Sequence, residues 1–360
     1  MKLGLLGFPS SGKTTLFRLL TGASVDSAPA GKDPFRVGVA RVPDPRIDHL
    51  VKIFRPKKIT RSTVEFLDPT AVRGPARREA APYQEIRTAD GFLHVLRAFA
   101  DPSVPIPEGG VDPARDVRGM ETELLLADLV SVEKRLEKLE ISVRKNRNPD
   151  DQAEREILER VRAGLEKERP VRQTDLRPEE RKKVRGFDFL TDKPILGFLN
   201  LDEADCGNPD AGLRKYGLEA GGADQLHAGF CAASARIELE VNQLDPGDAE
   251  EFRKDLGITD SCRDQVIRGA RGVLDQATFF TCGETEVRAW DFPASMVAQK
   301  VAGRIHSDME RGFIRAEVIA YKDLMEAGSM AAARERGTLR MEGREYPVLD
   351  GDIITFRFHV

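Results

Sequence analysis

The N-terminal segment reads Leu3-Gly4-Leu5-Leu6 followed by Gly7-Phe8-Pro9-Ser10-Ser11-Gly12-Lys13-Thr14. The first run predicts a short buried strand, the second fits the pattern G-x-x-x-x-G-K-[ST], and residues 15–20 have the apolar spacing of a helix. The two glycines would let the backbone wrap around phosphate oxygens, with N–H groups pointing inward at a helix N-terminus. A chance glycine-rich turn is the alternative, but the flanking strand and helix favour a phosphate-binding loop.

This motif assigns roles to individual residues of a Mg²⁺–nucleotide site. Lys13, the candidate catalytic residue, should reach the β- and γ-phosphates, and the Thr14 hydroxyl should sit on Mg²⁺. Residues 63–68 predict a second strand ending in Asp68, which would hold Mg²⁺ through water, although an Asp there is often only a turn or cap residue. The candidate nucleotide-binding residues of this region are Gly7, Pro9, Ser10, Ser11, Gly12, Lys13, Thr14 and Thr15.

A candidate base-recognition segment follows another predicted buried strand, residues 194–199. It reads Asn200-Leu201-Asp202-Glu203, where GTPases carry Asn-Lys-x-Asp. Leu201 replaces the cation and Glu203 replaces the Asp that accepts two hydrogen bonds from guanine, so guanine recognition should weaken. Adenine is therefore the expected base, and a plain turn after a strand is the alternative interpretation.

A second candidate for base contact lies further along the chain. Residues 230–233 predict a fourth strand, and Ser234-Ala235 follow it. Small residues there would let backbone amides approach the base. A Ser-Ala pair is weak evidence by itself. It gains weight because it follows the three predicted strands and their loops in the order expected of a nucleotide-binding domain.

Composition restricts the class of protein. The chain has 360 residues and a formal net charge of -4, so any nucleic-acid or membrane surface would have to be a local patch. No apolar segment has the length of a membrane span or a signal sequence, which favours the cytoplasm. Widely spaced cysteines make a disulfide framework or zinc site unlikely to be the organising feature; they are Cys206, Cys231, Cys262 and Cys282.

A helical hairpin is predicted between the second and third strands. Apolar residues recur at steps of four and three, as in a coiled coil. They are Leu125, Leu129, Val132, Leu136, Leu139 and Val143, with a return seam of Leu158, Val161 and Leu165 after a turn at residues 146–150. Residues 134–185 contain 17 basic and 12 acidic side chains. This basic arm would suit the phosphates of ribosomal RNA, and a solvated charged face is the alternative.

The last part of the chain predicts a small mixed sheet with a helix. Residues 287–290, 312–318, 346–349 and 353–356 are predicted strands, residues 322–336 are predicted helical, and Asp350-Gly351 is a predicted turn. Taken together, the elements predict an α/β fold with a P-loop nucleotide-binding domain (residues 1–120 and 190–277), an inserted antiparallel helical coiled-coil hairpin (121–189) and a C-terminal domain (278–360).

With these elements in order, the chain resembles the YchF / Obg-like ATPase family, as a divergent member. The resemblance covers nearly the whole chain and is strongest in Phe279-Phe280-Thr281, in residues 286–290 and 305–318, and in residues 350–358. It implies a C-terminal β-grasp domain called TGS, ATP preferred over GTP, Mg²⁺ as cofactor, and a link to ribosomes and stress responses. It also implies a phosphate loop at residues 7–14, Asp68 linked to Mg²⁺, and base contacts from Asn200, Glu203, Ser234 and Ala235.

The chain departs from the family pattern around the γ-phosphate. The family has Asp-x-x-Gly, whereas here the residue three positions after Asp68 is Ala71. An alanine is strained if the site needs a positive φ at this position. Val72 stands where small GTPases place a catalytic Gln, but it matches the family, which has an apolar residue at this position. Residues 23–58 contain no Thr that could bind Mg²⁺. Nucleotide binding should persist while hydrolysis is slow or impaired, because each lost transition-state contact can cost roughly 10²–10³ in rate.

Three functions stay open at the level of the sequence. The chain can be a slow Mg²⁺-dependent ATPase acting as a ribosome-associated switch, a nucleotide-binding module in which hydrolysis is lost, or a GTP-preferring GTPase. His94 and His306 are interpreted as structural residues, and neither is assigned a catalytic role.

Overall fold

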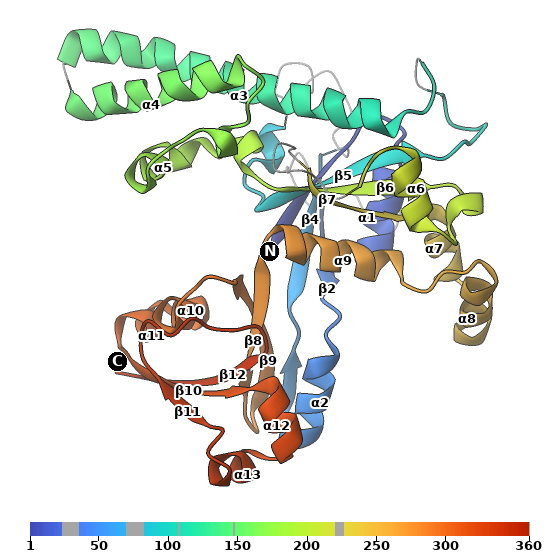
Figure 1. Cartoon of the computed structure of the whole chain (residues 1–360), viewed down its shortest axis with the longest axis vertical. Helices are drawn as coiled ribbons and strands as arrows, with labels where there is room; N and C mark the ends of the chain where they lie inside the picture. The colour runs from blue at the N-terminus through green and yellow to red at the C-terminus, as the bar shows by residue number, and fades with distance from the viewer. Residues whose placement is uncertain (24–35, 70–82, 107–108, 147, 220–226, 360) are drawn as a thin grey trace. The chain divides into compact units, whose positions relative to one another are not determined.

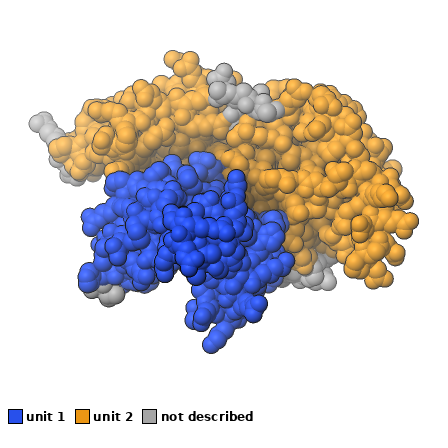
Figure 2. Space-filling model, turned by 60° about the horizontal axis from the view of Figure 1, so that its bottom comes forward, with its two compact units in different colours: residues 1, 41–64, 274–360 blue, residues 2–40, 65–273 orange. Residues whose placement is uncertain are grey.

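The computed structural model describes the chain apart from residues 24–35, 70–82, 107–108, 147, 220–226 and 360 (Figure 1). It divides into two compact units, coloured separately in Figure 2. Residues 2–40 and 65–273 form the large unit, and residues 1, 41–64 and 274–360 form the C-terminal unit. The C-terminal boundary lies close to the predicted one, whereas residues 41–64, predicted within the nucleotide-binding domain, group with the C-terminal residues.

The large unit is organised by a six-stranded sheet with the order β2-β4-β1-β5-β6-β7. The strands are β1 (Lys2–Leu6), β2 (Arg36–Arg41), β4 (Thr63–Asp68), β5 (Gly91–Ala98), β6 (Ile195–Leu201) and β7 (His227–Ala233). From β4 to β7 neighbouring strands pair in parallel, so their carboxyl ends lie at one edge. Sequence analysis predicted β1, β4, β6 and β7 but missed β5, whose eight residues are all buried.

Helices cover both faces of this sheet. Ile195 packs with Met120 and Leu124 of α3, while the next residue, Leu196, packs against Gly269 of α9. Successive strand residues point to opposite faces, so α3 and α9 lie on opposite sides. The helices of this unit are α1 (Lys13–Thr21), α3 (Pro113–Asn146), α4 (Pro149–Leu165), α5 (Pro178–Val184), α6 (Pro209–Lys215), α7 (Ala235–Val241), α8 (Pro246–Asp255) and α9 (Cys262–Val273).

The predicted hairpin is formed by α3 and α4, which lie side by side in Figure 1. Its shared core buries Val132, Leu136 and Leu139 of α3 against Leu158 and Val161 of α4. The helices continue further than predicted. Helix α3 begins at Pro113, before the predicted boundary, and ends at Asn146, while α4 already begins at Pro149, within the predicted turn. The first half of α3 covers the sheet and the second half extends into the hairpin.

A buried ion pair fixes the middle of α3. The Asp128 carboxylate is fully buried and accepts a 2.9 Å hydrogen bond from Nη1 of Arg87. It also accepts bonds from the backbone N–H groups of Leu190 and Thr191 at 3.0 and 2.8 Å, and from the Thr191 hydroxyl at 2.9 Å. A buried carboxylate needs such partners. The point where the hairpin leaves the sheet is therefore set by one side chain.

The C-terminal unit contains a mixed six-stranded sheet with the order β11-β10-β12-β8-β9-β3. Its strands are β3 (Lys58–Thr60), β8 (Gln276–Cys282), β9 (Glu286–Pro293), β10 (Phe313–Ala320), β11 (Arg340–Glu342) and β12 (Asp352–Phe358). Strands β8 and β12 pair in parallel, as do β3 and β9, whereas β10 pairs antiparallel with β11 and β12, and β8 pairs antiparallel with β9. Its helices are α2 (Pro45–Phe54), α10 (Ala298–Ile305), α11 (Ser307–Arg311), α12 (Tyr321–Ala327) and α13 (Met330–Glu335).

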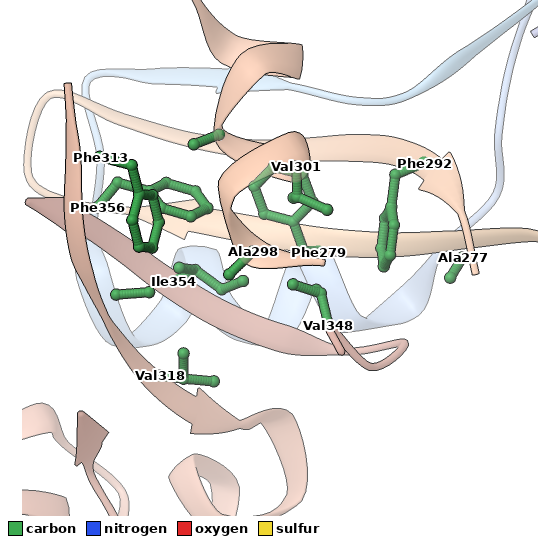
Figure 3. Close-up of a cluster of buried hydrophobic side chains, with 12 residues drawn as sticks. Ala277, Phe279, Phe292, Ala298, Val301, Phe313, Val318, Val348, Ile354 and Phe356 are labelled. Carbon is green, nitrogen blue, oxygen red and sulfur yellow. The ribbon is translucent and has the colours of Figure 1, made fainter. Parts of the chain in front are cut away.

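An aromatic core holds this unit together (Figure 3). Phe279 of β8 packs edge-on against Phe292 and Phe356, and Phe356 packs in turn on Phe313. These rings come from four different strands, and helix α10 closes over them with Ala298 and Val301.

Two predicted elements of this unit are wrong. The helix predicted for residues 322–336 is broken into α12 and α13, because Gly328 takes a left-handed conformation with φ 76° and ends α12. Residues 346–349 are not a strand, and only Pro347 forms an isolated bridge, to Val297. Pro347 has no N–H group to donate to a neighbouring strand, which explains why the strand prediction is wrong.

In the described parts of the chain, every helix is too short or too polar to span a bilayer.

Candidate functional site

The phosphate loop runs from the end of β1 into the start of α1. Gly7 and Gly12 have positive φ angles of 140° and 97°. A Cβ on Gly12 would lie 2.2 Å from Nδ2 of Asn200, and a Cβ on Gly7 would lie 2.6 Å from the carbonyl oxygen of Val95. Only glycine fits both positions, so the motif is required by the backbone path and by its close neighbours. The first amides of α1 have no partner within the helix and are available to an anion.

Lys13, the first residue of α1, is 8 % exposed and its ammonium lies inside the loop. Its Nζ donates to the carbonyl oxygens of Gly7 and Phe8 at 2.8 and 2.7 Å. The Lys13 side chain thus folds back over the phosphate loop and donates to two of its carbonyl oxygens. The hydroxyl of Ser11 is buried and has no hydrogen-bond partner among the described residues. A loop with a held ammonium and an unused hydroxyl fits a phosphate group.

Asn200 links the phosphate loop to the segment after β7. Its Nδ2 donates to the carbonyl oxygen of Ser11 at 3.1 Å, and its Oδ1 accepts from the amide of Ala235 at 3.1 Å. Both ends of the side-chain amide are therefore engaged by backbone groups. This geometry gives Asn200 the task of holding together two loops that sequence analysis placed in one site.

The predicted residues line one pocket of about 560 Å³ at the carboxyl ends of the parallel strands. This is the position at which open α/β sheets bind ligands, and the size suits a small organic ligand. The predicted residues that line it are Gly7, Pro9, Ser10, Gly12, Lys13, Thr14, Thr15, Asn200, Leu201, Glu203 and Ser234. Ser11, Ala235 and Asp68 are buried close to these segments rather than in the pocket wall.

The two residues proposed to control base choice have different surroundings. Leu201 is the last residue of β6, is 1 % exposed and belongs to an apolar cluster with Leu199 and Leu218. Glu203 is exposed at the pocket, just beyond Asp202, whose carboxylate accepts from the amides of Ala100 and Glu203 at 3.1 and 2.8 Å. Asp202 thus holds the backbone of Glu203, whose exposed side chain lines the pocket.

Sequence analysis missed the loop that forms another wall, residues 99–104. Arg97 is 2 % exposed and holds this loop, since its Nε donates to the Phe99 carbonyl at 3.2 Å and its Nη1 to the Pro105 carbonyl at 2.7 Å. The Arg97 guanidinium also lies over the Phe99 ring, 4.8 Å from its centroid. An arginine within an apolar strand is the signal that was available, because such a charge needs local acceptors.

A chain of buried polar groups lies beneath the phosphate loop. Nδ1 of His94 is 2.8 Å from Nε2 of His227, and Nδ1 of His227 is 3.2 Å from a carboxylate oxygen of Glu121. Burial, with smaller contributions from His227 and Lys13, lowers the pKa of His94 well below its ordinary value, so this imidazole is neutral at physiological pH. The structural interpretation of His94 agrees with this burial.

The predicted metal residues are Thr14 and Asp68. Thr14 lines the pocket, and Asp68 at the end of β4 is fully buried. Hydroxyl and carboxylate oxygens are donors that Mg²⁺ accepts, so the residues fit the metal. The Asp68 carboxylate is paired with Arg36, whose Nη2 lies 2.7 Å from Oδ2. Ala71, the departure from the family pattern near the γ-phosphate, and Val72 lie outside the described residues.

Comparison with known proteins places this site in a family context. The family model YchF-GTPase_C, described as a protein of unknown function (DUF933), matches residues 276–359. The chain is 40% identical over 371 residues to the ribosome-binding ATPase YchF of Bacillus subtilis (strain 168), covering 99% of each protein. It is 34% identical to Obg-like ATPase 1 of Oryza sativa subsp. japonica, over 100% of this chain and 92% of that protein.

A solved structure agrees with these sequence matches. The Schizosaccharomyces pombe YchF GTPase superposes with a TM-score of 0.79 at 28% identity, covering 99% of this chain and 97% of that one. The predicted fold class is thereby confirmed: a P-loop α/β domain with an inserted helical hairpin and a C-terminal TGS-like domain. The predicted resemblance is also confirmed, and the chain belongs to the YchF / Obg-like ATPase family.

Proposed function

We propose that the chain binds a purine nucleoside triphosphate with Mg²⁺, prefers ATP to GTP, hydrolyses it slowly, and acts as a ribosome-associated nucleotide switch in the cytoplasm. The observation that carries the proposal is the single pocket that collects the phosphate loop, Glu203 and Ser234 from three separate strand ends. The relatives named ribosome-binding ATPases support the choice of nucleotide and partner.

Each group in the pocket has a proposed task. The amides at the start of α1 and Lys13 bind the phosphates, and Thr14 with Asp68 holds Mg²⁺, which neutralises charge on the β- and γ-phosphates when bound. The Asn200 side chain holds the phosphate loop and the Ser234-Ala235 segment together through its two hydrogen bonds. Glu203 faces the base. Lys13 is thus the side chain on which both binding and any turnover depend.

A nucleotide-binding module without hydrolysis is the second candidate. It is favoured by Ala71, which stands where the family pattern has a glycine, and by Val72, an apolar residue that cannot orient a water molecule. The two candidates share the pocket and differ only in turnover. A GTP-preferring GTPase, the activity named for the S. pombe relative, is the alternative for the base.

Base preference is tested by calorimetric titration of ATP and GTP with Mg²⁺ present. The wild type should bind ATP more tightly, and Glu203→Asp should shift the ratio toward GTP by up to about tenfold, the value of one well-placed hydrogen bond. Leu201→Lys is unsuitable because residue 201 is buried in an apolar cluster. Glu240→Asp, another carboxylate lining the pocket, is the control. Tighter GTP binding by the wild type would contradict the ATP assignment.

Ribosome association is tested by co-sedimentation at low and high salt. If the basic arm contacts RNA phosphates, binding should fall severalfold between about 50 and 200 mM salt. Reversing the charge of the exposed arm residues Lys182 and Arg185 to Glu should weaken it further. Lys52→Glu with Lys57→Glu, exposed lysines of the C-terminal unit, is the matched control. Ribosome binding that does not depend on salt concentration would contradict the proposed contact between the basic arm and RNA phosphates.

A further inference from the structure

Two walls of the nucleotide pocket are joined by one ion pair. One wall is the loop of residues 99–104 after β5, and the other is the start of helix α7. Asp101 of the loop and Arg236 of α7 both line the pocket, and Nη1 of Arg236 lies 3.7 Å from Oδ2 of Asp101. Neither residue was predicted as a site residue, and the two segments lie far apart in the sequence.

The loop presents one carboxylate oxygen to α7. Arg97 and Asp202 hold the loop through its backbone. Within it, Oδ1 of Asp101 accepts from the amide and the hydroxyl of Ser103 at 2.9 and 2.6 Å, whereas Oδ2 faces Arg236. The bonds from Ser103, and to a smaller extent the charge of Arg236, lower the pKa of Asp101, so this carboxylate is ionised at neutral pH. The two oxygens of Asp101 thus have separate roles.

The Arg236 side chain is oriented from its own helix. Its Nε donates to Oε1 of Glu240, one turn further along α7, at 3.0 Å. The side chain is 72% exposed although it lines the pocket, so it lies at the open side of the pocket rather than in its interior. Its distance from Asp101 is that of an ion pair and is longer than a hydrogen bond, which leaves room for the two groups to approach.

We propose that Arg236 is a positioning residue for the bound nucleotide: its ion pair with Asp101 joins the loop to α7 at the open side of the pocket and slows the release of the ligand. This inference rests on the proposed function. In this role the pair joins two protein walls and does not contact the base, so it acts on ATP and GTP alike. Because the pair is partly exposed, its effect is a severalfold change in rate.

Attraction of the nucleotide's phosphates is the other role that an exposed arginine could have at this pocket. The two roles predict opposite results when the charge of Asp101 is removed. Attraction acts mainly on association, so a pocket without the Asp101 carboxylate would bind the anionic ligand faster and hold it at least as long. An ion pair between two walls acts on release, so the same change would let the ligand leave faster.

The test is a stopped-flow measurement of the association and release of a fluorescent, non-hydrolysable ATP analogue with Mg²⁺ present. In Arg236→Gln and in Asp101→Asn, release should be about two- to fivefold faster than in the wild type. Asp101→Asn keeps an oxygen that can accept from Ser103, so it removes the ion pair and retains the turn. The double variant should release the analogue no faster than either single variant, because both changes remove the same interaction.

Arg268→Gln is the matched control, because Arg268 is an exposed arginine that pairs with Asp260 and lies outside the lining of this pocket. It should release the analogue at the wild-type rate. An Asp101→Asn protein that releases the analogue at the wild-type rate or more slowly overturns the inference and leaves the proposed function intact. A wild type that binds neither ATP nor GTP overturns both.

Salt provides a second measurement on the same proteins. Charges exposed to solvent are screened as ionic strength rises, whereas the phosphate contacts of the buried Lys13 are screened less. The difference in release rate between the wild type and Arg236→Gln should therefore shrink as salt is raised from about 50 to 500 mM. A difference that stays constant over this range would contradict an exposed ion pair as its cause.

Discussion

A Lys13→Ala variant should fold like the wild type and lose nucleotide binding by about two orders of magnitude, because a charge-assisted hydrogen bond to phosphate contributes roughly 1.5–3 kcal/mol and Lys13 is placed to make more than one. In the described structure the ammonium already lies in the phosphate loop, donating to the carbonyls of Gly7 and Phe8. Thermal protection by Mg²⁺–ATP should therefore be present in the wild type and absent in the variant.

Phosphate release by the same pair of proteins separates the two candidate functions. Turnover that disappears in Lys13→Ala identifies an ATPase, while ATP binding without Lys13-dependent turnover identifies a binding module. Lys215→Ala, an exposed lysine on α6, is the control and should behave like the wild type. If saturating ATP and GTP both failed to raise the melting temperature of the wild type, the phosphate-loop assignment itself would be lost.

Replacing Asp128 with Ala should lower the free energy of unfolding by about 3–5 kcal/mol, the cost of breaking a buried ion pair by removing one partner. Arg87 would be left as a buried charge without its carboxylate, and the amides of Leu190 and Thr191 would lose their acceptor. Denaturant unfolding of the purified protein measures the effect, and a decrease below about 1 kcal/mol would contradict this account of how α3 is anchored.

The matched control for Asp128 is Glu140→Ala. Glu140 also lies on α3 and also pairs with an arginine, Arg144, but both side chains are more than half exposed. Exposed pairs one helical turn apart contribute only about 0.3–0.5 kcal/mol. The comparison therefore contrasts a buried carboxylate that has several hydrogen-bond donors with an exposed carboxylate on the same helix that also pairs with an arginine.

The phosphate loop and the hairpin could be predicted from the sequence because their determinants are contiguous. Gly7 and Gly12 act on the backbone path of their own loop, and the apolar seams of α3 and α4, helices that follow each other closely in the sequence, pack against each other. Local elements of this kind depend on backbone conformation and apolar spacing, which are both visible in one segment. The base-contact and metal assignments from the same motifs stay predictions.

Strand β5 shows the limit of this procedure. Its apolar run contains His94 and Arg97, two polar residues that a local pattern treats as signs of exposure. Both are buried, because His94 finds His227 on β7 and Arg97 finds the carbonyls of residues 99–105. The partner of His94 is distant along the chain and those of Arg97 are close, but the tertiary structure is what buries both pairs within the sheet and its adjoining loop. The strand prediction for residues 346–349 was wrong for the opposite reason. The segment has an apolar pattern, but Pro347 has no N–H group to donate to a neighbouring strand.

The sequence by itself determined the family and the strand, loop and helix of the N-terminal segment, residues 2–21. The tertiary structure alone decided that Asn200 ties the phosphate loop to Ala235, that residues 41–64 group with the C-terminal unit, and that Arg36 is the counter-charge of Asp68. The physical reason is that a buried polar side chain takes whichever partner the fold brings within hydrogen-bond distance, and sequence spacing does not specify that partner.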